Sequence, residues 1–307
     1  MDILAIGEPL MEFSEVSDPA RGSLYLPGFG GDTSNFAVAA ARQGAKVGYL
    51  TRVGADSFGD QFLQFWQGEG IDTSLVARDP DAHTGIYFIT HTPQGHQFTY
   101  LRKGSAASRI QPDDIPEATI ASLRLLHVSG ISQAISDTSC DAVFRAIAIA
   151  RAHGVTLSYD PNLRLKLWPL ARARAVIHET ATLADVFLPS LEDATQLTGL
   201  EEPDQIVDAY LAMGVELIAL KLGRQGVLVA TATERYRVAG FTVKTVDATG
   251  AGDTFDGAFV TQLLAGATPR EAARYANAAA ALTTTGYGAV SPIPTSDAVR
   301  ALLAQQP

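Results

Sequence analysis

The sequence has 307 residues, of which 47% are hydrophobic and 18% are charged, and its formal net charge is −10. This balance is typical of a soluble globular protein with a large core, and the acidic charge argues against nonspecific nucleic-acid binding and against an anionic membrane surface. The single cysteine, Cys140, excludes an intrachain disulfide and a cysteine-based metal site.

The N-terminus is acidic and lacks the basic region of a signal peptide. Apolar runs are all shorter than a membrane-spanning helix requires. We therefore expect a cytoplasmic protein that has no membrane partner and no nucleic-acid partner.

Apolar runs of strand length alternate with helical patterns along most of the chain. The strand-like runs are 3–7, 47–53, 125–129, 156–160, 186–189 and 217–222, and the helical stretches are 35–43, 58–67, 139–151, 171–183 and 203–213. This alternation predicts βαβ units, and hence a parallel sheet with helices on both faces. In such a sheet the ligand lies beyond the carboxyl ends of the strands.

One region breaks the alternation. Residues 84–92 and 97–102 flank Pro-Gln-Gly-His at 93–96 and predict a hairpin, and residues 11–16 and 23–29 supply further strands. These strands come from two separate parts of the sequence, about 11–29 and 84–102. We therefore expect a small sheet inserted as a lid into a single domain, 1–307, rather than a second independent domain.

The first glycine-rich loop spans 28–35 and reads Gly-Phe-Gly-Gly-Asp-Thr-Ser-Asn before an apolar helical stripe. Its glycines allow close approach of a ligand, and Asp32 and Asn35 offer acceptors and donors that suit sugar hydroxyls. A flexible turn capped by Asp32 or Ser34 explains the segment equally well.

The end of the predicted hairpin carries an aromatic residue and a basic residue on one face. Tyr100 and Arg102 are two residues apart, and Tyr87 on the partner strand could share their face, while Ile86 and Phe88 lie on the other. The alternative is a solvated arginine at a strand end.

Two later loops follow predicted strands. Residues 160–169 read Asp-Pro-Asn-Leu-Arg-Leu-Lys-Leu-Trp-Pro, a loop fixed by prolines that is either a polar site or an Asx turn. Residues 221–226 read Lys-Leu-Gly-Arg-Gln-Gly, a strand–turn–strand that either wraps nucleotide phosphates or simply connects strands. A Walker-type loop is absent, and no Gly-x-Gly-x-x-Gly follows the first strand, which argues against a dinucleotide-binding dehydrogenase.

The most informative segment is 247–255, Asp-Ala-Thr-Gly-Ala-Gly-Asp-Thr-Phe. Gly250 and Gly252 let the backbone present N–H groups to an anion, and the apolar spacing that follows predicts a helix beginning near Ala251. The dipole and unpaired N–H groups of a helix start stabilise a phosphate. Asp253 would repel that phosphate, so we interpret it as a base that deprotonates an attacking hydroxyl. The alternative is a helix cap beside a glycine turn.

Gly30-Gly31-Asp32 with Asn35, together with 247–255, resemble the two signature regions of the ribokinase-like (PfkB) sugar kinases, and the resemblance covers almost the whole chain. Within that family, residues 100–109, 160–168 and the opening Gly7-Glu8-Pro9-Leu10 are most similar to kinases of the sugar acid 2-keto-3-deoxygluconate. The resemblance implies a Rossmann-like three-layer α/β/α fold with a small β-sheet lid. It also implies transfer of the ATP γ-phosphoryl group to a sugar hydroxyl with Mg²⁺, and it leaves a monovalent-cation requirement open.

The resemblance further implies roles for individual residues. Asp253 would be the catalytic base, and the anion hole would be Gly250, Ala251 and Gly252. Gly31, Tyr100, Arg102 and Arg164 would bind the sugar acid, joining Asp32, Asn35 and Tyr87. Asn162, Lys221, Gly223 and Gly226 would lie along ATP.

One departure from the family pattern concerns the metal. Many members carry Asn-x-x-Glu where this chain has Ser190-Leu191-Glu192-Asp193. Ser190 and Asp193 keep oxygen ligands, which leaves a water-mediated role near Mg²⁺ open for them. We place Ser190 with the nucleotide and assign no residue directly to the metal.

The partners that we expect are a small sugar acid, ATP and a second copy of the chain. If Tyr87, Tyr100 and Arg102 face the substrate, then Ile86, Phe88 and Leu101 face away and need cover. Lid-to-lid dimers, or larger assemblies of them, would supply it. The alternatives are a neutral-sugar kinase of the fructokinase or ribokinase type and a catalytically silent sugar- or nucleotide-binding regulator, which an intact Asp253 disfavours.

Overall fold

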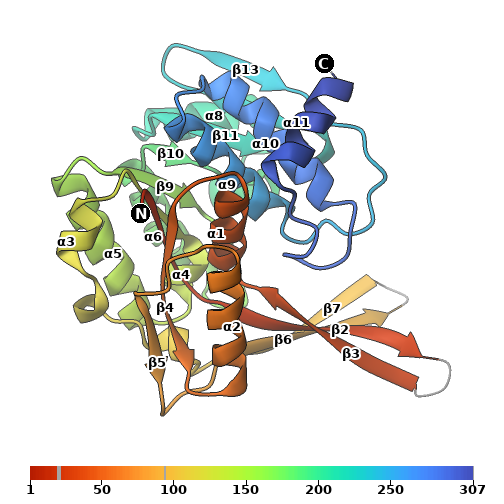
Figure 1. Ribbon diagram of the computed structural model, residues 1–307. Coiled ribbons are helices and arrows are strands. Elements are labelled where there is room, and N and C mark those ends of the chain that lie inside the picture. The colour runs from red at the N-terminus through yellow and green to blue at the C-terminus, as the bar shows by residue number, and fades with distance from the viewer. Residues whose placement is uncertain (19–21, 93–94, 307) are drawn as a thin grey trace.

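The protein is built on a nine-stranded sheet held between two layers of helices, from which a smaller sheet projects (Figure 1). The computed structural model describes residues 1–18, 22–92 and 95–306. The strand order is β13-β12-β11-β10-β9-β8-β1-β4-β5, and every neighbouring pair from β11 to β5 is parallel. The strands are β1 (Ile3–Ile6), β4 (Val47–Gly54), β5 (Val76–Asp79), β8 (Leu125–Ser129), β9 (Thr156–Asp160), β10 (Val186–Phe187), β11 (Leu217–Lys221), β12 (Val227–Ala230) and β13 (Arg235–Val238).

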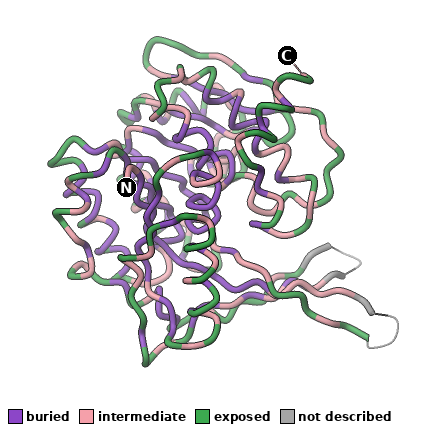
Figure 2. Tube along the Cα trace, viewed as in Figure 1, coloured by how far each residue is buried: buried purple, intermediate pink, exposed green. Residues whose placement is uncertain are grey.

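The two faces of this sheet are covered by different helices. One layer contains α3 (Glu117–Ala121), α5 (Asp137–Ala152), α6 (Leu170–Leu183) and α8 (Pro203–Ala212). The other contains α1 (Asp32–Arg42), α2 (Ser57–Gly68), α9 (Ala251–Leu264), α10 (Pro269–Thr283) and α11 (Ser296–Gln305). Two separate groups of buried apolar side chains fill the spaces between the layers. Figure 2 shows the buried residues of the chain in purple. The predicted three-layer α/β/α fold is confirmed.

Each strand and helix that was predicted for the nine-stranded sheet and its covering helices is present, with ends shifted by a few residues. The turn around Gly223 and Gly226 connects β11 to β12. Strand β12 is antiparallel to both of its neighbours, β11 and β13. Short helices α4 (Gly130–Ala134) and α7 (Leu191–Thr198) follow β8 and β10. Among the described residues, no helix combines the length and apolar character that crossing a membrane requires.

The smaller sheet has the order β3-β2-β6-β7 and confirms the predicted lid strands. Its strands are β2 (Leu10–Asp18), β3 (Gly22–Gly30), β6 (Gly85–Thr92) and β7 (Gly95–Leu101). The register places Tyr87 between Glu12 and Tyr100, so these three side chains share one face. Of the predicted hairpin turn, Pro93 and Gln94 lie outside the described residues.

The opposite face of the lid packs on α2 near the base of the sheet. Phe13 meets Phe58 edge to face at a centroid distance of 5.7 Å, and Phe29 stacks on Phe65 at 4.2 Å. The lid is thus attached to the main body by aromatic contacts as well as by its connecting loops.

Helices α1 and α9 approach each other backbone to backbone. A Cβ at Gly257 would lie 2.7 Å from the carbonyl oxygen of Phe36 and 2.9 Å from the amide nitrogen of Ala40. Only glycine fits there without displacing a helix, and the contact fixes the positions of Asn35 on α1 and Asp253 on α9.

Candidate active site

The predicted site residues gather where the carboxyl ends of β1, β9 and β11 meet the first turns of α1 and α9. Parallel strands carry their following loops to one edge of the sheet, which explains the meeting of segments that are far apart in sequence. The lid strands β2 and β6 begin at the same edge (Figure 1).

Asp253 occupies the first turn of α9, and its Oδ2 accepts a hydrogen bond of 2.8 Å from Asn35 Nδ2. Burial and the charge of Asp32 raise the pKa of Asp253 to about 7, against the opposing effect of the Asn35 bond and the charge of Lys221. A carboxylate that titrates near neutral pH is suited to accept a proton from a hydroxyl.

The helix start beside Asp253 exposes backbone donors. Gly250 has a φ of 74°, and a Cβ there would collide with the carbonyl oxygen of Ala289, so only glycine fits. Thr254 N–H closes the first helical bond on Gly250 O at 2.9 Å. Within the described residues, no backbone carbonyl accepts from the N–H groups of Gly252 or Asp253. This turn therefore offers backbone donors to an anion.

The start of α1 presents unsatisfied acceptors to the same space. Gly31 has a φ of 100°, and a Cβ at this position would collide with Glu8 O. Oδ1 of Asp32 and Oδ1 of Asn35 are buried and have no hydrogen-bond partner among the described residues. Buried acceptors of this kind ordinarily have a partner, and ligand hydroxyls would supply it.

Arg102 is not a solvated strand end. Its Nη2 forms an ion pair with Oε2 of Glu8, whose side chain is fully buried, and Ser105 Oγ donates to Oε1 of the same carboxylate at 2.9 Å. The guanidinium lies 5.4 Å from the ring centroid of Tyr100. Its Nε is buried and has no partner in the described part of the chain. A buried donor of this kind ordinarily has a partner.

A second buried carboxylate, Glu12, lies on the site-facing side of the lid. Tyr87 Oη donates to Glu12 Oε2, and both side chains are buried. Burial raises the pKa of Glu12, and the Tyr87 hydrogen bond opposes this shift. The ring of Tyr87 stacks on Tyr100 at 5.7 Å. Sequence reasoning identified Tyr87 and Tyr100 but missed Glu12 and did not predict a role for Glu8.

The loop after β9 contains both an Asx turn and residues that face the site. Asn162 N–H donates to Asp160 Oδ1 at 3.0 Å, and Asn162 is the only described non-glycine residue with positive φ. Its Nδ2 donates to Asp32 Oδ2 at 3.2 Å. Asn162, which was predicted to lie along ATP, therefore contacts a residue that was predicted to bind the sugar. Arg164 is exposed and donates to the neighbouring Leu163 O at 2.9 Å. Burial raises the pKa of Asp32, and the nearby charge of Arg164 counteracts it.

Apart from Asn162, which follows β9, the residues predicted along ATP lie at the ends of β10 and β11. Gly223 and Gly226 have φ values of 58° and 97° and form the turn into β12. Lys221 Nζ lies between two carboxylates, 3.1 Å from Asp160 Oδ2 and 2.9 Å from Asp256 Oδ2. Ser190 forms an isolated parallel β-bridge with Lys221. It also caps the N-terminus of α7, because its Oγ accepts a hydrogen bond of 3.1 Å from Asp193 N.

Among the residues that the structure describes, no group of three or more His, Cys, Asp or Glu side chains is arranged to hold a metal ion. Mg²⁺ in phosphoryl-transfer sites is bound mainly by substrate phosphates and water, with one or two carboxylates. Asp193, in the first turn of α7, is a carboxylate beside the loop after β9. Burial raises its pKa to about 6, and its Oδ2 accepts from Leu163 N at 3.1 Å.

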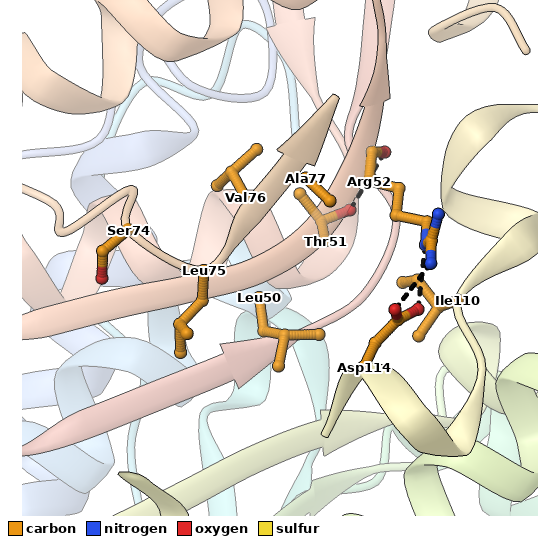
Figure 3. A pocket seen from close by; sticks show the side chains of 9 residues that line it. All are labelled: Leu50, Thr51, Arg52, Ser74, Leu75, Val76, Ala77, Ile110 and Asp114. Atoms are coloured by element: carbon orange, nitrogen blue, oxygen red, sulfur yellow. Dashed lines mark hydrogen bonds and ion pairs between the residues drawn. The ribbon is translucent and has the colours of Figure 1, made fainter. Parts of the chain in front are cut away.

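A pocket elsewhere on the molecule does not belong to this site (Figure 3). It lies between β4, β5 and the turn that carries Asp114, and none of the predicted site residues lines it. Arg52 reaches Asp114 with two hydrogen bonds of 2.8 and 2.6 Å, so its charge is already paired.

Known proteins resemble this chain along nearly its whole length. The model of the family described as "pfkB family carbohydrate kinase" matches residues 2–296. The 2-dehydro-3-deoxygluconokinase of Thermoproteus tenax is 36% identical over 92% of this chain and 88% of its own, and that of Bacillus subtilis (strain 168) is 34% identical over 100% and 96%.

Solved structures superpose over nearly the whole chain. A putative ribokinase II from E. coli in complex with ATP and Mg²⁺ has a TM-score of 0.92 at 27% identity, covering 99% of both chains. A fructokinase from Vibrio cholerae O395 with bound fructose, ADP and calcium ion has a TM-score of 0.87 at 32% identity, again covering 99% of both chains.

Proposed function

The chain belongs to the pfkB family of carbohydrate kinases, and we propose that this sugar kinase phosphorylates the sugar acid 2-keto-3-deoxygluconate to its 6-phosphate. We infer that residues 1–307 act as a single kinase domain with a lid. The two curated relatives described above act on this compound, which is also called 2-dehydro-3-deoxygluconate.

The observation that carries the choice of a sugar acid is the state of Arg102. Its guanidinium is nearly buried, with 12% of the side chain exposed, and its Nε lacks a partner among the described residues. A substrate carboxylate would satisfy this donor, and Arg164 at the edge of the site would add a second guanidinium. Gly31, Asp32, Asn35, Tyr87 and Tyr100 would surround the hydroxyl groups and the sugar chain.

In the proposed reaction Asp253 accepts the proton of the primary hydroxyl as its oxygen attacks the γ-phosphorus. Backbone N–H groups of Gly250 and Gly252 stabilise the charge on the phosphoryl oxygens, and Ala251 N–H joins them by releasing its 3.2 Å hydrogen bond to Ala248 O. Asn162, Ser190, Lys221, Gly223 and Gly226 lie along ATP. Mg²⁺ bound to ATP would neutralise charge on its phosphates, and Asp193 would hold a water of that ion.

The test is kcat/KM for 2-keto-3-deoxygluconate, fructose and ribose in the wild type and in Arg102→Ala. We expect the wild type to prefer the sugar acid. Arg102→Ala should lose most of that preference, because the guanidinium that pairs with the substrate carboxylate is gone and Glu8 is left to repel it. Arg78→Ala is the matched control, since Arg78 forms a surface pair with Asp60.

A neutral-sugar kinase is the second candidate, and one observation favours it. Glu8 already neutralises Arg102 within the protein, so a neutral ligand does not face an isolated charge there. If the wild-type kcat/KM for fructose or ribose equals that for the sugar acid, the neutral-sugar kinase replaces the sugar-acid kinase as the proposed function. A silent binding protein would show no ATP turnover with any of the three sugars.

A further inference from the structure

The ammonium group of Lys221 links the three segments that build the site. Its Nζ lies 3.1 Å from Asp160 Oδ2 at the end of β9 and 3.0 and 2.9 Å from the two carboxylate oxygens of Asp256 on α9. All three side chains are nearly buried, with 12%, 7% and 1% of Lys221, Asp160 and Asp256 exposed. The site-building loops after β9 and β11 and the first turns of α9 are therefore held by one charge cluster.

Gly252, which is part of the proposed anion hole, lies beside this ammonium. A Cβ placed on Gly252 would be 3.6 Å from Lys221 Nζ, and Gly252 itself is exposed. Because glycine has no side chain, an anion on the N–H groups of this turn has the ammonium beside it. An alanine at 252 would fit sterically and would cover Nζ.

We propose that Lys221 is a further catalytic residue, whose ammonium contacts the phosphoryl group during transfer, and that Asp160 and Asp256 are positioning residues that hold it there. The inference rests on the proposed phosphoryl transfer but not on which sugar is the acceptor. The bond that forms joins the sugar oxygen to the γ-phosphorus, and the bond that breaks joins that phosphorus to the β,γ-bridging oxygen. ADP leaves with the electron pair, and the hydroxyl proton passes to Asp253.

The chemistry of the cluster suits this role. An ammonium has three N–H donors, and the two oxygens of the Asp256 carboxylate are close enough together to share one of them. Asp160 takes a second, which leaves a third for a phosphoryl oxygen. Burial alone would lower the pKa of Lys221, but Asp160 and Asp256 reverse the shift and raise it, so the group stays charged.

Such a fixed charge acts mainly on the transition state. The transferred phosphoryl group spreads negative charge over its three outer oxygens, and a preoriented cation in a site that excludes water stabilises that charge without reorganising. The ammonium of Lys221 would stabilise bound ADP, which lacks the phosphoryl group in transfer, much less. This difference separates a catalytic Lys221 from one that only ties β11 to α9.

The first test compares Lys221→Met with the wild type. We expect kcat to fall by about 10²–10³-fold, as for loss of one oxyanion donor. The affinity for ADP with aluminium fluoride, a mimic of the phosphoryl group in transit, should fall with it, while the affinity for ADP alone stays close to that of the wild type. Lys46→Met is the matched control, because Lys46 is exposed at the amino end of the sheet.

A second variant covers the case in which Lys221→Met does not fold, since it strands two buried carboxylates. Lys221→Met/Asp256→Asn removes the ammonium and one negative charge together and should show the same loss of ADP–aluminium fluoride affinity. The proposal is overturned if either folded variant binds ADP–aluminium fluoride as tightly as the wild type.

The choice of acceptor keeps this test independent of the proposed substrate. The measurements use whichever sugar the wild type phosphorylates, so a preference for fructose would overturn the sugar-acid assignment and leave the Lys221 test intact. If none of the sugars is accepted, ADP–aluminium fluoride binding without sugar decides the question.

Discussion

The carboxylate of Glu8 and the guanidinium of Arg102 form a buried ion pair that joins the loop after β1 to the end of lid strand β7. Ser105 binds the other oxygen of Glu8. The pair fixes the orientation of Arg102 before any substrate arrives, and it links the lid to the main body by a charge contact.

The pair predicts a strong dependence of stability on both partners. Arg102→Ala strands a buried carboxylate, and removing one member of a buried ion pair costs about 3–5 kcal/mol. The double variant Glu8→Leu/Arg102→Met removes both charges and should be more stable than Arg102→Ala. Denaturant unfolding of the variants measures the difference, and equal stability of the single and double variants would show that Glu8 is solvated.

Asp253→Asn should reduce kcat by about 10²–10⁴-fold, the usual contribution of a general base. The amide keeps the shape and can still accept from Asn35, so the sugar dissociation constant should change little. Asp297→Asn is the control, because Asp297 lies in the first turn of α11, away from the site. A near-normal kcat in Asp253→Asn would exclude Asp253 as the base.

The pH dependence of kcat should follow the titration of Asp253. Burial and the charge of Asp32 raise its pKa to about 7, and the base must be deprotonated, so activity should rise with pH and reach half of its plateau near pH 7. Asn35→Ala removes a hydrogen bond that favours the carboxylate, and its half-point should move to higher pH. A half-point that is unchanged in Asn35→Ala would contradict this assignment.

The same shift predicts that stability falls as pH rises. The folded state binds the Asp253 proton more tightly than the unfolded chain does. Its contribution is therefore complete below pH 3.8, where an ordinary aspartate titrates, and is lost as pH rises through about 7. Asp253→Asn lacks this dependence and should be more stable than the wild type at pH 8. Melting temperatures of the wild type and of Asp253→Asn at pH 5 and pH 8 provide the measurement. If Asp253→Asn is no more stable than the wild type at pH 8, burial of the Asp253 carboxylate does not destabilise the folded protein.

The lid carries exposed apolar side chains that favour a dimer. Tyr25 and Leu101, 41% and 53% exposed, lie on the face opposite Tyr87, whereas Ile86 and Phe88 on that face are half-buried. We expect a lid-to-lid dimer in which Leu101→Lys shifts the assembly toward monomer. Leu26→Lys is the matched control, because Leu26 is 56% exposed on the other lid face. Light scattering that shows a wild-type monomer at micromolar concentration would rule the dimer out.

The sequence predicted the framework because its signals are local. Buried parallel strands are short apolar runs, and the glycine turn before Asp253 is contained in one segment. Helix α10 was missed although Thr268 and Glu271 form a capping box around Pro269, a pattern that is readable in the sequence. The sequence therefore contains a local signal for the start of α10.

The rest of the site could not be predicted because its contacts are long-range. Glu8 and Glu12 meet partners 94 and 75 residues away, and Asp256 meets Lys221 across 35 residues. An isolated glutamate or aspartate carries no local sign of its partner. Only the register of the lid strands and the crossing of α9 over the strand ends bring these side chains together.

The close contact at Gly257 and the hydrogen bond from Asn35 to Asp253 join α1 and α9 at two points, with the proposed hydroxyl ligand Asn35 on one helix and the proposed proton acceptor Asp253 on the other. A replacement lid would leave this pair of helices unchanged. The proposed proton transfer therefore depends on the main body, whereas Arg102, on which the proposed preference for a sugar acid rests, lies at the end of lid strand β7. We expect a chimera that takes β2, β3, β6, β7 and position 102 from a fructokinase to change its sugar selectivity while retaining the geometry between Asn35 and Asp253.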